Sequence, residues 1–261
     1  MTGRLTIAAA ALFAGFLAGT GPAAAERLVT SISRHQVLVN SSFTGTSIVL
    51  FGTVEPDSPT ARRATAYDLI VTVSGPKQII VERRKERVLG IWANMASRTF
   101  LNVPSYLAVL SNQPVEQIAN ADTVRTQQLG LADKLLPQQL GNDVADVVRD
   151  DPFRTNFIRL KTRQNLYLQR ANGVTLLTPT VFRAEISLPA VAPIGNYDVD
   201  VKAFADGVLL TRANSAFEVV KVGFEQFVAT AAQDYGLVYG LTTAMMAIMT
   251  GWFAAVVFRR D

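Results

Sequence analysis

The chain has 261 residues, of which 49% are apolar and 18% charged, and its formal net charge is +4. It contains no cysteine and a single histidine, His35. Disulfides, cysteine-ligated zinc, iron–sulfur clusters and histidine-rich metal sites are therefore excluded. We expect no bound cofactor and no metal site in the one or two domains that this length allows.

Residues 1–25 have the pattern of a secretory signal peptide. Arg4 provides a positive charge, and the 14 residues Leu5–Ala18 that follow are uncharged. Ala23–Ala25 then supply the small residues of a cleavage site before Glu26. Because a stable membrane span needs ~20 residues, we predict that this shorter segment directs export and is removed.

A second uncharged stretch, Gly236–Phe258, is 23 residues long. As a helix it would measure ~34 Å, enough to cross a hydrocarbon core of ~30 Å. Tyr235 and Trp252 lie towards its two ends, as interfacial aromatic residues do. The tail that follows, residues 259–261, carries two arginines, and the positive-inside rule places it in the cytoplasm.

Together the two ends predict a bacterial inner-membrane protein. Residues 26–233 would form a periplasmic domain, residues 236–258 the transmembrane helix and residues 259–261 the cytoplasmic C-terminus. Without the ends, 22 basic and 20 acidic residues remain, so the charge falls to +2. We therefore expect a membrane but no nucleic acid as a partner, and the residues indicate no particular small-molecule ligand.

Small residues recur along the predicted membrane helix at spacings of three or four. They are Gly236, Gly240, Ala244, Ala247, Gly251 and Ala255. Such a stripe lets a second helix approach closely, although glycine and alanine are also common in membrane helices. We predict that this face packs against a second copy of the chain or against another membrane protein.

Alternation of apolar and polar residues predicts strands in the first hundred residues. The predicted strands are Leu28–Asn40, Thr46–Val54, Tyr67–Ser74, Gln78–Arg83 and, as a short one, Val88–Trp92. The segment Glu55–Thr60 predicts a loop because it is rich in turn residues. Ile91 and Trp92 are expected in the core.

Residues 100–171 lose this alternation and predict helices instead. The short candidates are Pro104–Leu110, Pro114–Ala119, Thr123–Leu129 with Asp122 as its cap, and Asp143–Arg149 with Asn142 as its cap. Asp151-Pro152 is a good start for a longer helix that runs to about Gln169. Its buried face is expected to carry Phe153, Phe157, Leu160 and Leu168, with Arg154 outside.

Strands resume after Gly173. They are Val174–Leu177, Val181–Leu188, Tyr197–Phe204 and Val208–Val220, and Asp206-Gly207 predicts a tight hairpin turn before the last. Tyr197 follows a turn and precedes clean alternation. This arrangement is typical of a strand near the end of an immunoglobulin-like sandwich.

Each of these two groups of strands has an apolar face to bury. We predict a mainly β fold, an immunoglobulin-like β-sandwich with a helical insertion at about 100–171, followed by one C-terminal transmembrane helix. The alternative is two small β domains joined by helices. The repeated pair Tyr67-Asp68 and Tyr197-Asp198, each opening an alternating strand, favours that alternative mildly.

The residues suggest no catalytic constellation. A serine triad would have to use His35, for which a surface position is expected, and the chain has no Gly-x-Ser-x-Gly elbow. An acidic cluster at Asp143, Asp146, Asp150 and Asp151 lacks the glycine of a calcium loop. We predict no catalytic, cofactor-binding or metal-binding residues.

One dense charged run, Glu82–Arg87, interleaves basic with acidic residues. We interpret it as a solvated hairpin or edge strand, where charges discourage pairing with other chains. The alternatives are a small anion site and a contact with lipid head groups.

Five segments stand out in combination: Phe43–Gly52, Arg83–Asn94, Asn102–Tyr106, Phe182–Ile186 and Val222–Glu225. Together they resemble a family of alphaproteobacterial transmembrane proteins with a signal peptide, a β-rich periplasmic domain and one C-terminal span. The resemblance covers nearly the whole chain and carries no catalytic residues. It implies genes next to those of sulfite-exporter-like permeases, and hence an accessory role.

Two functions are compatible with these observations. The first is a non-enzymatic accessory or assembly partner of another membrane protein, for which the resemblance implies a sulfite-exporter-like permease. The second is a membrane-anchored periplasmic hydrolase. It would need two buried carboxylates in one pocket, with shifted pKa values.

Overall fold

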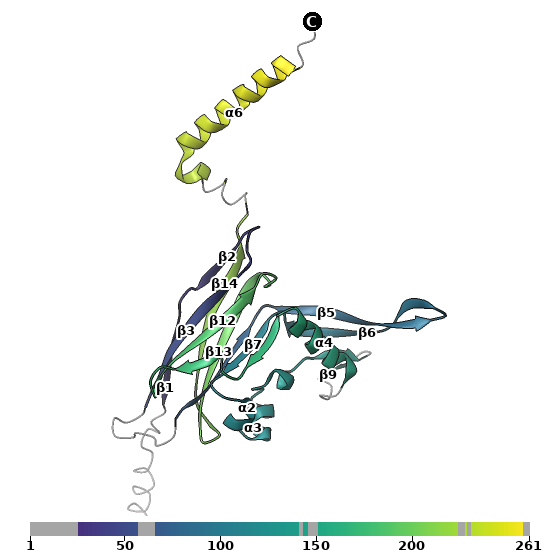
Figure 1. Ribbon diagram of the computed structural model, residues 1–261, viewed down its shortest axis with the longest axis vertical. Helices are drawn as coiled ribbons and strands as arrows, with labels where there is room; N and C mark the ends of the chain where they lie inside the picture. The colour runs from purple at the N-terminus through teal and green to yellow at the C-terminus, as the bar shows by residue number, and fades with distance from the viewer. Residues whose placement is uncertain are drawn as a thin grey trace, which may run out of the picture.

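The computed structural model describes residues 26–56, 66–140, 143–145, 151–223, 228 and 231–257. The predicted signal peptide and the C-terminal tail lie outside these residues, as do Asp146, Asp150 and most of the predicted loop at 55–60. Figure 1 shows a β-rich body, a long hairpin that leaves its side, and a C-terminal helix apart from both.

The first sheet of the body is antiparallel throughout, in the order β1-β3-β12-β11. Its strands are β1 (Arg27–Ile32), β3 (Gly45–Glu55), β12 (Val181–Pro189) and β11 (Val174–Leu176). At its centre β3 pairs with β12 from Gly45 opposite Pro189 to Thr53 opposite Val181. The sheet therefore joins the early and late parts of the chain.

The second sheet has six strands in the order β10-β7-β4-β13-β14-β2. They are β10 (Tyr167–Arg170), β7 (Leu107–Ser111), β4 (Asp68–Ser74), β13 (Gly195–Ala205), β14 (Val208–Lys221) and β2 (Gln36–Val39). The two outer pairs, β10 with β7 and β14 with β2, are parallel, and the inner pairs are antiparallel. This sheet also joins early and late parts of the chain, through the pairs β4 with β13 and β14 with β2.

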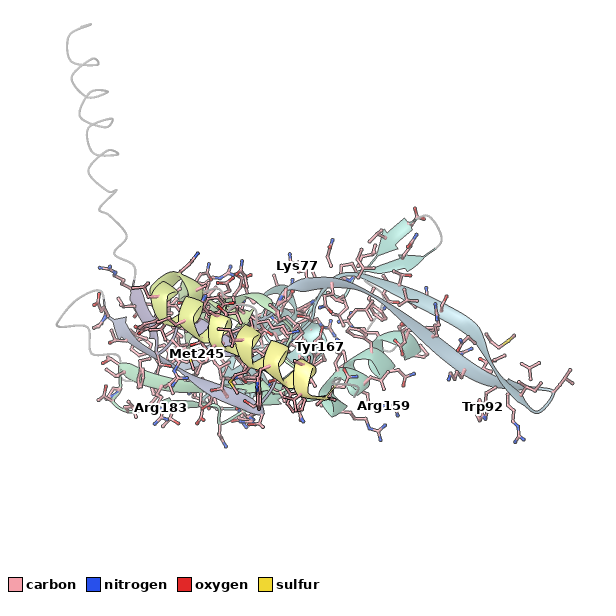
Figure 2. All side chains as sticks on the ribbon, turned by 90° about the horizontal axis from the view of Figure 1, so that it is seen from above. Lys77, Trp92, Arg159, Tyr167, Arg183 and Met245 are labelled. Atoms are coloured by element: carbon pink, nitrogen blue, oxygen red, sulfur yellow. The ribbon has the colours of Figure 1, made fainter. Side chains whose placement is uncertain are left out.

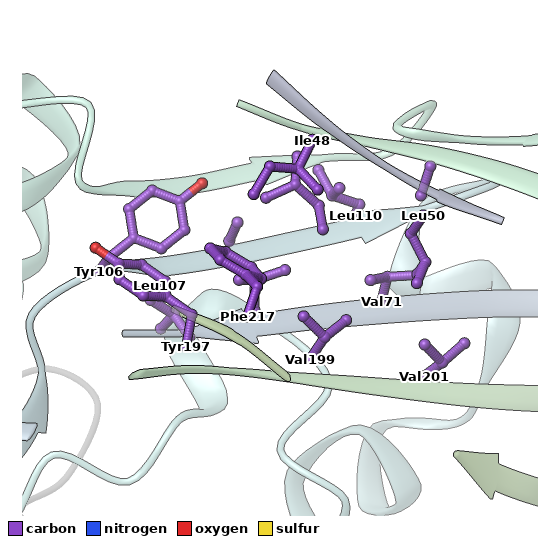
Figure 3. Close-up of a cluster of buried hydrophobic side chains, with 14 of the residues drawn as sticks. Ile48, Leu50, Val71, Tyr106, Leu107, Leu110, Tyr197, Val199, Val201 and Phe217 are labelled. Carbon is purple, nitrogen blue, oxygen red and sulfur yellow. The ribbon is translucent and has the colours of Figure 1, made fainter. Parts of the chain in front are cut away.

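The two sheets share one hydrophobic core (Figure 3). Ile48 and Leu50 of β3 lie in it together with Val71 of β4 and Val199 of β13, all 0–1% exposed. Strands from both sides of the region 100–171 therefore bury their apolar faces against each other. Neither strand group has a core of its own among the described residues.

The region between β4 and β10 holds the remaining elements. A third sheet has the order β5-β6-β8-β9, with β5 (Lys77–Val88), β6 (Ile91–Pro104), β8 (Gln138–Leu140) and β9 (Asp143–Ala145). The helices here are α2 (Val115–Ile118), α3 (Ala121–Thr126), the short 3-10 turn η1 (Leu131–Asp133) and α4 (Pro152–Arg163). The predicted helical insertion is thus a mixture of strands and helices.

The predicted helix at Pro104–Leu110 is wrong, because this segment contributes the strand β7. All five residues of β7 are buried. One face lies in the sandwich core, and on the other Val109 packs in a smaller cluster with Val115 and Ile118 of α2. A strand buried on both faces has a continuous apolar run, which periodicity cannot distinguish from a buried helix.

Four other predicted boundaries are wrong. The segment Leu28–Asn40 is not one strand but two, β1 and β2, which are separated by residues 33–35 and belong to different sheets. The segment Val88–Trp92 is not one strand, because Leu89 and Gly90 turn the chain between β5 and β6. Helix α3 is capped by Asn120, whose side chain accepts a hydrogen bond of 2.8 Å from the Thr123 amide, and not by Asp122. Asp143–Ala145, predicted as helical, is the strand β9.

Helix α4 begins where predicted. Asp151 is its N-cap, its side chain accepts a 2.9 Å hydrogen bond from the Arg154 amide, and Pro152 is the first helical residue. The helix ends at Arg163, earlier than predicted, and Asn165 with a φ of 56° turns the chain into β10. Leu168, expected on the helix, is therefore a residue of β10.

The predicted faces of α4 are partly wrong. Phe157 is buried and stacks on Phe100 with ring centroids 4.4 Å apart, but Leu160 is 45% exposed. Arg154, expected outside, is 3% exposed because its Nη2 donates to the carbonyl oxygens of Ala132 at 3.1 Å and Lys134 at 2.6 Å. Backbone acceptors thus make the burial of this guanidinium possible.

The late strands agree with the prediction. Asp206 and Gly207 both have positive φ, 51° and 79°, as a two-residue hairpin turn requires. The Tyr197 hydroxyl donates to the carbonyl oxygen of Pro193 at 2.7 Å, and its ring stacks on Phe217 at 4.9 Å. This is the geometry of a tyrosine corner. The mainly β class is confirmed, while the immunoglobulin-like detail stays a prediction.

The C-terminal helix α6 (Gly236–Val257) is long and apolar enough to cross a membrane, with a mean hydropathy of 1.6 over its best window. None of its residues is buried, and it extends away from the sheets (Figure 1). The body offers its apolar surface no cover. A lipid environment is the solvent that suits such a surface.

The contact between Gly52 of β3 and the ring of Phe182 on β12 provides a test of the sandwich packing. A Cβ at Gly52 would lie 2.6 Å from Cε1 of Phe182 and 2.9 Å from the Val29 carbonyl oxygen. We predict that Gly52→Ala lowers the free energy of unfolding by about 1–3 kcal/mol, measured by urea denaturation in detergent. Gly223→Ala is the control, because a Cβ there meets no atom within 4 Å. Equal effects of the two variants would contradict this packing.

Candidate functional site

The most conspicuous surface feature is the hairpin of β5 and β6, here called the arm (residues 77–104). Its strands pair from Lys77 opposite Pro104 at the base to Val88 opposite Ile91 at the end. Figure 2 shows Lys77 near the body and Trp92 at the far end. The arm is thus a two-stranded ribbon that carries its outer residues away from the sandwich.

Only the inner half of the arm is held by the rest of the chain. Strand β8 pairs with β6 at Thr99 and Phe100, and α4 lies against the same region. The guanidinium groups of Arg84 and Arg98 lie over the ring of Phe153 on α4, at 5.9 Å and 5.2 Å from its centroid. In the described part of the chain, the strand pairs beyond Arg84 have no further strand beside them.

The outer residues of the arm, 85–95, here called the tip, expose five large apolar side chains beyond the charged residues 85–87. Their exposed fractions are 40% for Val88, 99% for Leu89, 72% for Ile91, 67% for Trp92 and 57% for Met95. The expectation that Ile91 and Trp92 lie in the core is therefore wrong. Their strand belongs to a ribbon that leaves the body, so no second sheet covers them. Exposed apolar patches on a protein surface are characteristic of sites that contact another protein or a membrane.

The turn at the tip is an unusual place for a leucine. Leu89 and Gly90 have φ values of 49° and 88°, the left-handed conformation of a two-residue hairpin turn. Asparagine and glycine adopt it readily, whereas a bulky side chain is strained there. Since Leu89 contacts no core, neither folding nor packing explains its side chain.

The arm is also basic. Between residues 77 and 104 it carries six basic and two acidic side chains, a net charge of +4. The prediction of a solvated hairpin or edge strand for Glu82–Arg87 is confirmed: most of these residues are exposed, and Arg84 pairs with Glu86 at 2.5 Å. Exposed apolar side chains and a net positive charge therefore occur together on the arm.

Where the arm meets α4, the structure brings two carboxylates within electrostatic range. The pKa of Glu82 is raised to about 7, chiefly by burial and in addition by the negative charge of Asp151, while Arg159 opposes the shift. Asp151 already caps α4 through the Arg154 amide. Sequence reasoning missed this pair, because 69 positions separate its members and the signal lies in the packing of α4 on β5.

Two other features singled out from the sequence lie on the surface of the protein. His35 is exposed in the turn before β2, as expected, and its carbonyl oxygen accepts from the Glu218 amide at 2.8 Å. The predicted packing face of the membrane helix lies on α6 with every member exposed: Gly236, Gly240, Ala244, Ala247, Gly251 and Ala255. Among the described residues, no three acidic or histidine side chains are grouped so as to hold a metal ion.

Comparison with known proteins supports a membrane protein. The chain belongs to the family described as "Putative transmembrane protein (Alph_Pro_TM)", which it matches over residues 27–260. No curated protein sequence matches it. Among solved structures, the N-terminal domain of the Streptococcus gordonii adhesin Sgo0707 aligns at 8% identity with a TM-score of 0.27. That alignment covers 74% of this chain and 32% of the adhesin chain.

The shifted pKa of Glu82 predicts a pH dependence of stability. In the folded protein Glu82 keeps its proton up to about pH 7, but in the unfolded chain only up to about pH 4.5. Between these values the folded state binds more protons, so the free energy of unfolding falls as the pH rises. We expect a change of about 1 kcal/mol, because solvent screens this partly exposed group.

Urea denaturation in detergent at pH 5 and pH 7.5 measures this effect. The free energy of unfolding of the wild type should be lower at pH 7.5 than at pH 5 by about 1 kcal/mol. In Glu82→Gln this difference between the two pH values should disappear. Glu86→Gln, four residues along the same strand, is the matched control. A Glu82→Gln profile identical to that of the wild type would contradict the assignment.

Proposed function

We propose that this single-pass protein presents its β-sandwich in the periplasm as a non-enzymatic docking module for another inner-membrane protein. The observation that carries the proposal is the arm, whose tip exposes five large apolar side chains. An isolated two-stranded ribbon is only marginally stable in water. A partner that covers the tip would remove the apolar side chains from water and fix the ribbon.

The orientation proposed here rests on the two ends of the sequence. The leader-like residues 1–25 support export of the domain, and Arg259 and Arg260 beyond α6 support a cytoplasmic C-terminus. In this orientation α6 tethers the sandwich to the bilayer. The arm then searches a small volume near the membrane, which raises the effective concentration of any membrane partner.

The partner that we propose is a polytopic membrane protein, with a sulfite-exporter-like permease as the candidate that the family resemblance implies. Two separate surfaces could engage it: the tip outside the bilayer, and the small-residue face of α6 within it. Contacts on both sides of one tether reinforce each other without either being strong. An accessory or assembly role follows naturally from such a double contact.

A membrane-anchored hydrolase is the second candidate, and Glu82 beside Asp151 is the observation that favours it. A carboxyl with a pKa of about 7 next to a carboxylate is suited to proton transfer near neutral pH. Asp151, however, is engaged as the cap of α4. Hydrolysis of ester or glycoside substrates by the wild type, abolished in Glu82→Gln, would establish this function in place of docking.

We predict that the tip variants Leu89→Asn and Trp92→Ser separate docking from folding. Asparagine suits the left-handed turn, so Leu89→Asn should keep or slightly raise the free energy of unfolding. Both variants should sharply reduce recovery of the polytopic partner after mild crosslinking and pull-down from native membranes. For the wild type and for each variant, the amount of partner is divided by the amount of this chain recovered in the same pull-down.

Val208→Ser is the matched control for these variants. Val208 is 62% exposed and follows the turn Asp206-Gly207 just as Ile91 follows Leu89-Gly90. It should leave recovery of the partner unchanged. Equal recovery with all variants would reject the tip as the docking surface, and crosslinks to lipid alone would assign the tip to the bilayer instead.

The small-residue face of α6 gives a separate prediction. Leucine at Gly240 and Gly251 would prevent close approach of a second helix, so Gly240→Leu combined with Gly251→Leu should abolish association in a membrane two-hybrid assay. Leu241→Ile, outside the stripe, is the control. Unchanged association would show that this face does not pack against another helix.

A further inference from the structure

A groove of about 1060 Å³ crosses the outer face of the six-stranded sheet. Its floor comes from β4, β13 and β14, and its walls come from the connection between α3 and β8 and from the base of the arm. The groove is independent of the tip and of the proposed partner. The residues that line the groove come from four separate parts of the chain, within 72–77, 102–107, 126–137 and 196–215.

The floor is polar at the place where the apolar cover of the sheet ends. On β13 the outward positions Asp198, Asp200 and Lys202 line the groove, whereas the next one, Phe204, is buried in the smaller core cluster beneath α2 and α3. A sheet face only needs apolar residues where another layer covers it. The polar stretch therefore lines the groove between the two walls, and its exposure falls from the exposed Asp198 to the buried Lys202.

Positive charge is concentrated at one end of this floor. Lys202 is buried, and its Nζ donates to the Gln127 carbonyl oxygen at 2.8 Å and lies 3.6 Å from Oδ2 of Asp200. Arg212 on β14 donates from Nε to Oδ1 of the same Asp200 at 2.5 Å. The Asp200 carboxylate thus forms ion pairs with both Lys202 and Arg212.

A third cation, Lys134, enters from the wall. The pKa of Lys134 is lowered to about 8, chiefly by burial and in addition by the positive charges of Lys202 and Arg212, while Asp200 opposes the shift. Lys77 and Asp198 also line the groove and balance each other in charge. Three cations around one carboxylate leave a surplus of two positive charges in a partly desolvated space, which an anion would stabilise.

The neighbouring groups indicate the size and chemistry of that anion. Asn102, Asn214 and Ser215 line the groove with amide and hydroxyl donors, and no aromatic side chain is among its described lining residues. The described lining of the groove therefore has no aromatic ring on which a base or a sugar could stack. We infer that the end of the groove formed by Lys134, Lys202 and Arg212 binds a small anion that carries an oxyanion or carboxylate group.

Calorimetric titration of the full chain in a non-ionic detergent tests this site. The probes are sulfate, phosphate and citrate, in buffers matched in ionic strength with sodium chloride. We expect saturable 1:1 binding of at least one probe. Binding of sulfate or phosphate would indicate a preference for oxyanions, and binding of citrate a preference for carboxylates. Lys134→Met should weaken that binding about tenfold, the effect of one charge-assisted contact, and Lys134→Arg should restore most of it.

Lys161→Met is the matched control, since Lys161 is a partly buried lysine of α4 that does not line the groove. It should bind as the wild type does. Thermal unfolding of each variant without ligand confirms that it is folded. Absence of saturable binding for all three probes, or equal weakening by Lys134→Met and Lys161→Met, would overturn the assignment.

Discussion

Long-range strand pairing holds the body of this protein together. The pairs β3 with β12, β4 with β13 and β2 with β14 each join a strand from the first 75 residues to one beyond residue 180. Burial of one common core depends on all three pairs. The region between β4 and β10 is anchored in the sandwich by strands at both of its ends. It can therefore form the projecting arm although it has no large core of its own.

Two surfaces of different chemistry result from that arrangement. The arm carries apolar side chains and basic charge away from the body, while the groove at its base encloses polar groups and a positive cluster. Both depend on α4 and its preceding connection: α4 packs against the inner arm through Phe153 and Phe157, and Arg154 holds the carbonyl oxygen of Lys134. Displacement of α4 would therefore affect both surfaces together.

Local patterns predicted the parts of the fold that local forces determine. The membrane helix follows from hydropathy, the cap at Asp151 from its side-chain chemistry, and the turn Asp206-Gly207 from backbone preferences. Strand β7 was not predictable in this way, since burial on both faces removes its alternation. The expectation that Trp92 lies in the core fails because composition alone does not show whether a second layer covers a strand.

The candidate sites depended even more on tertiary structure. The charged run near residue 85 was visible as a solvated hairpin, but its apolar tip was not. The cluster of Lys134, Lys202 and Arg212 joins a loop to two strands, and the coupling of Glu82 with Asp151 joins a strand to a helix cap. No spacing in the sequence records such proximity, because sheet register and helix packing create it.

Hydrogen–deuterium exchange of the full chain, compared between native membranes and detergent, tests most directly whether the arm is a docking element. Because the ribbon beyond Arg84 has solvent on both edges, its amides should exchange rapidly in detergent. In native membranes the amides of residues 85–95 should exchange at least about tenfold more slowly, with β13 unchanged in both. Equal exchange of the tip in the two environments would contradict the account.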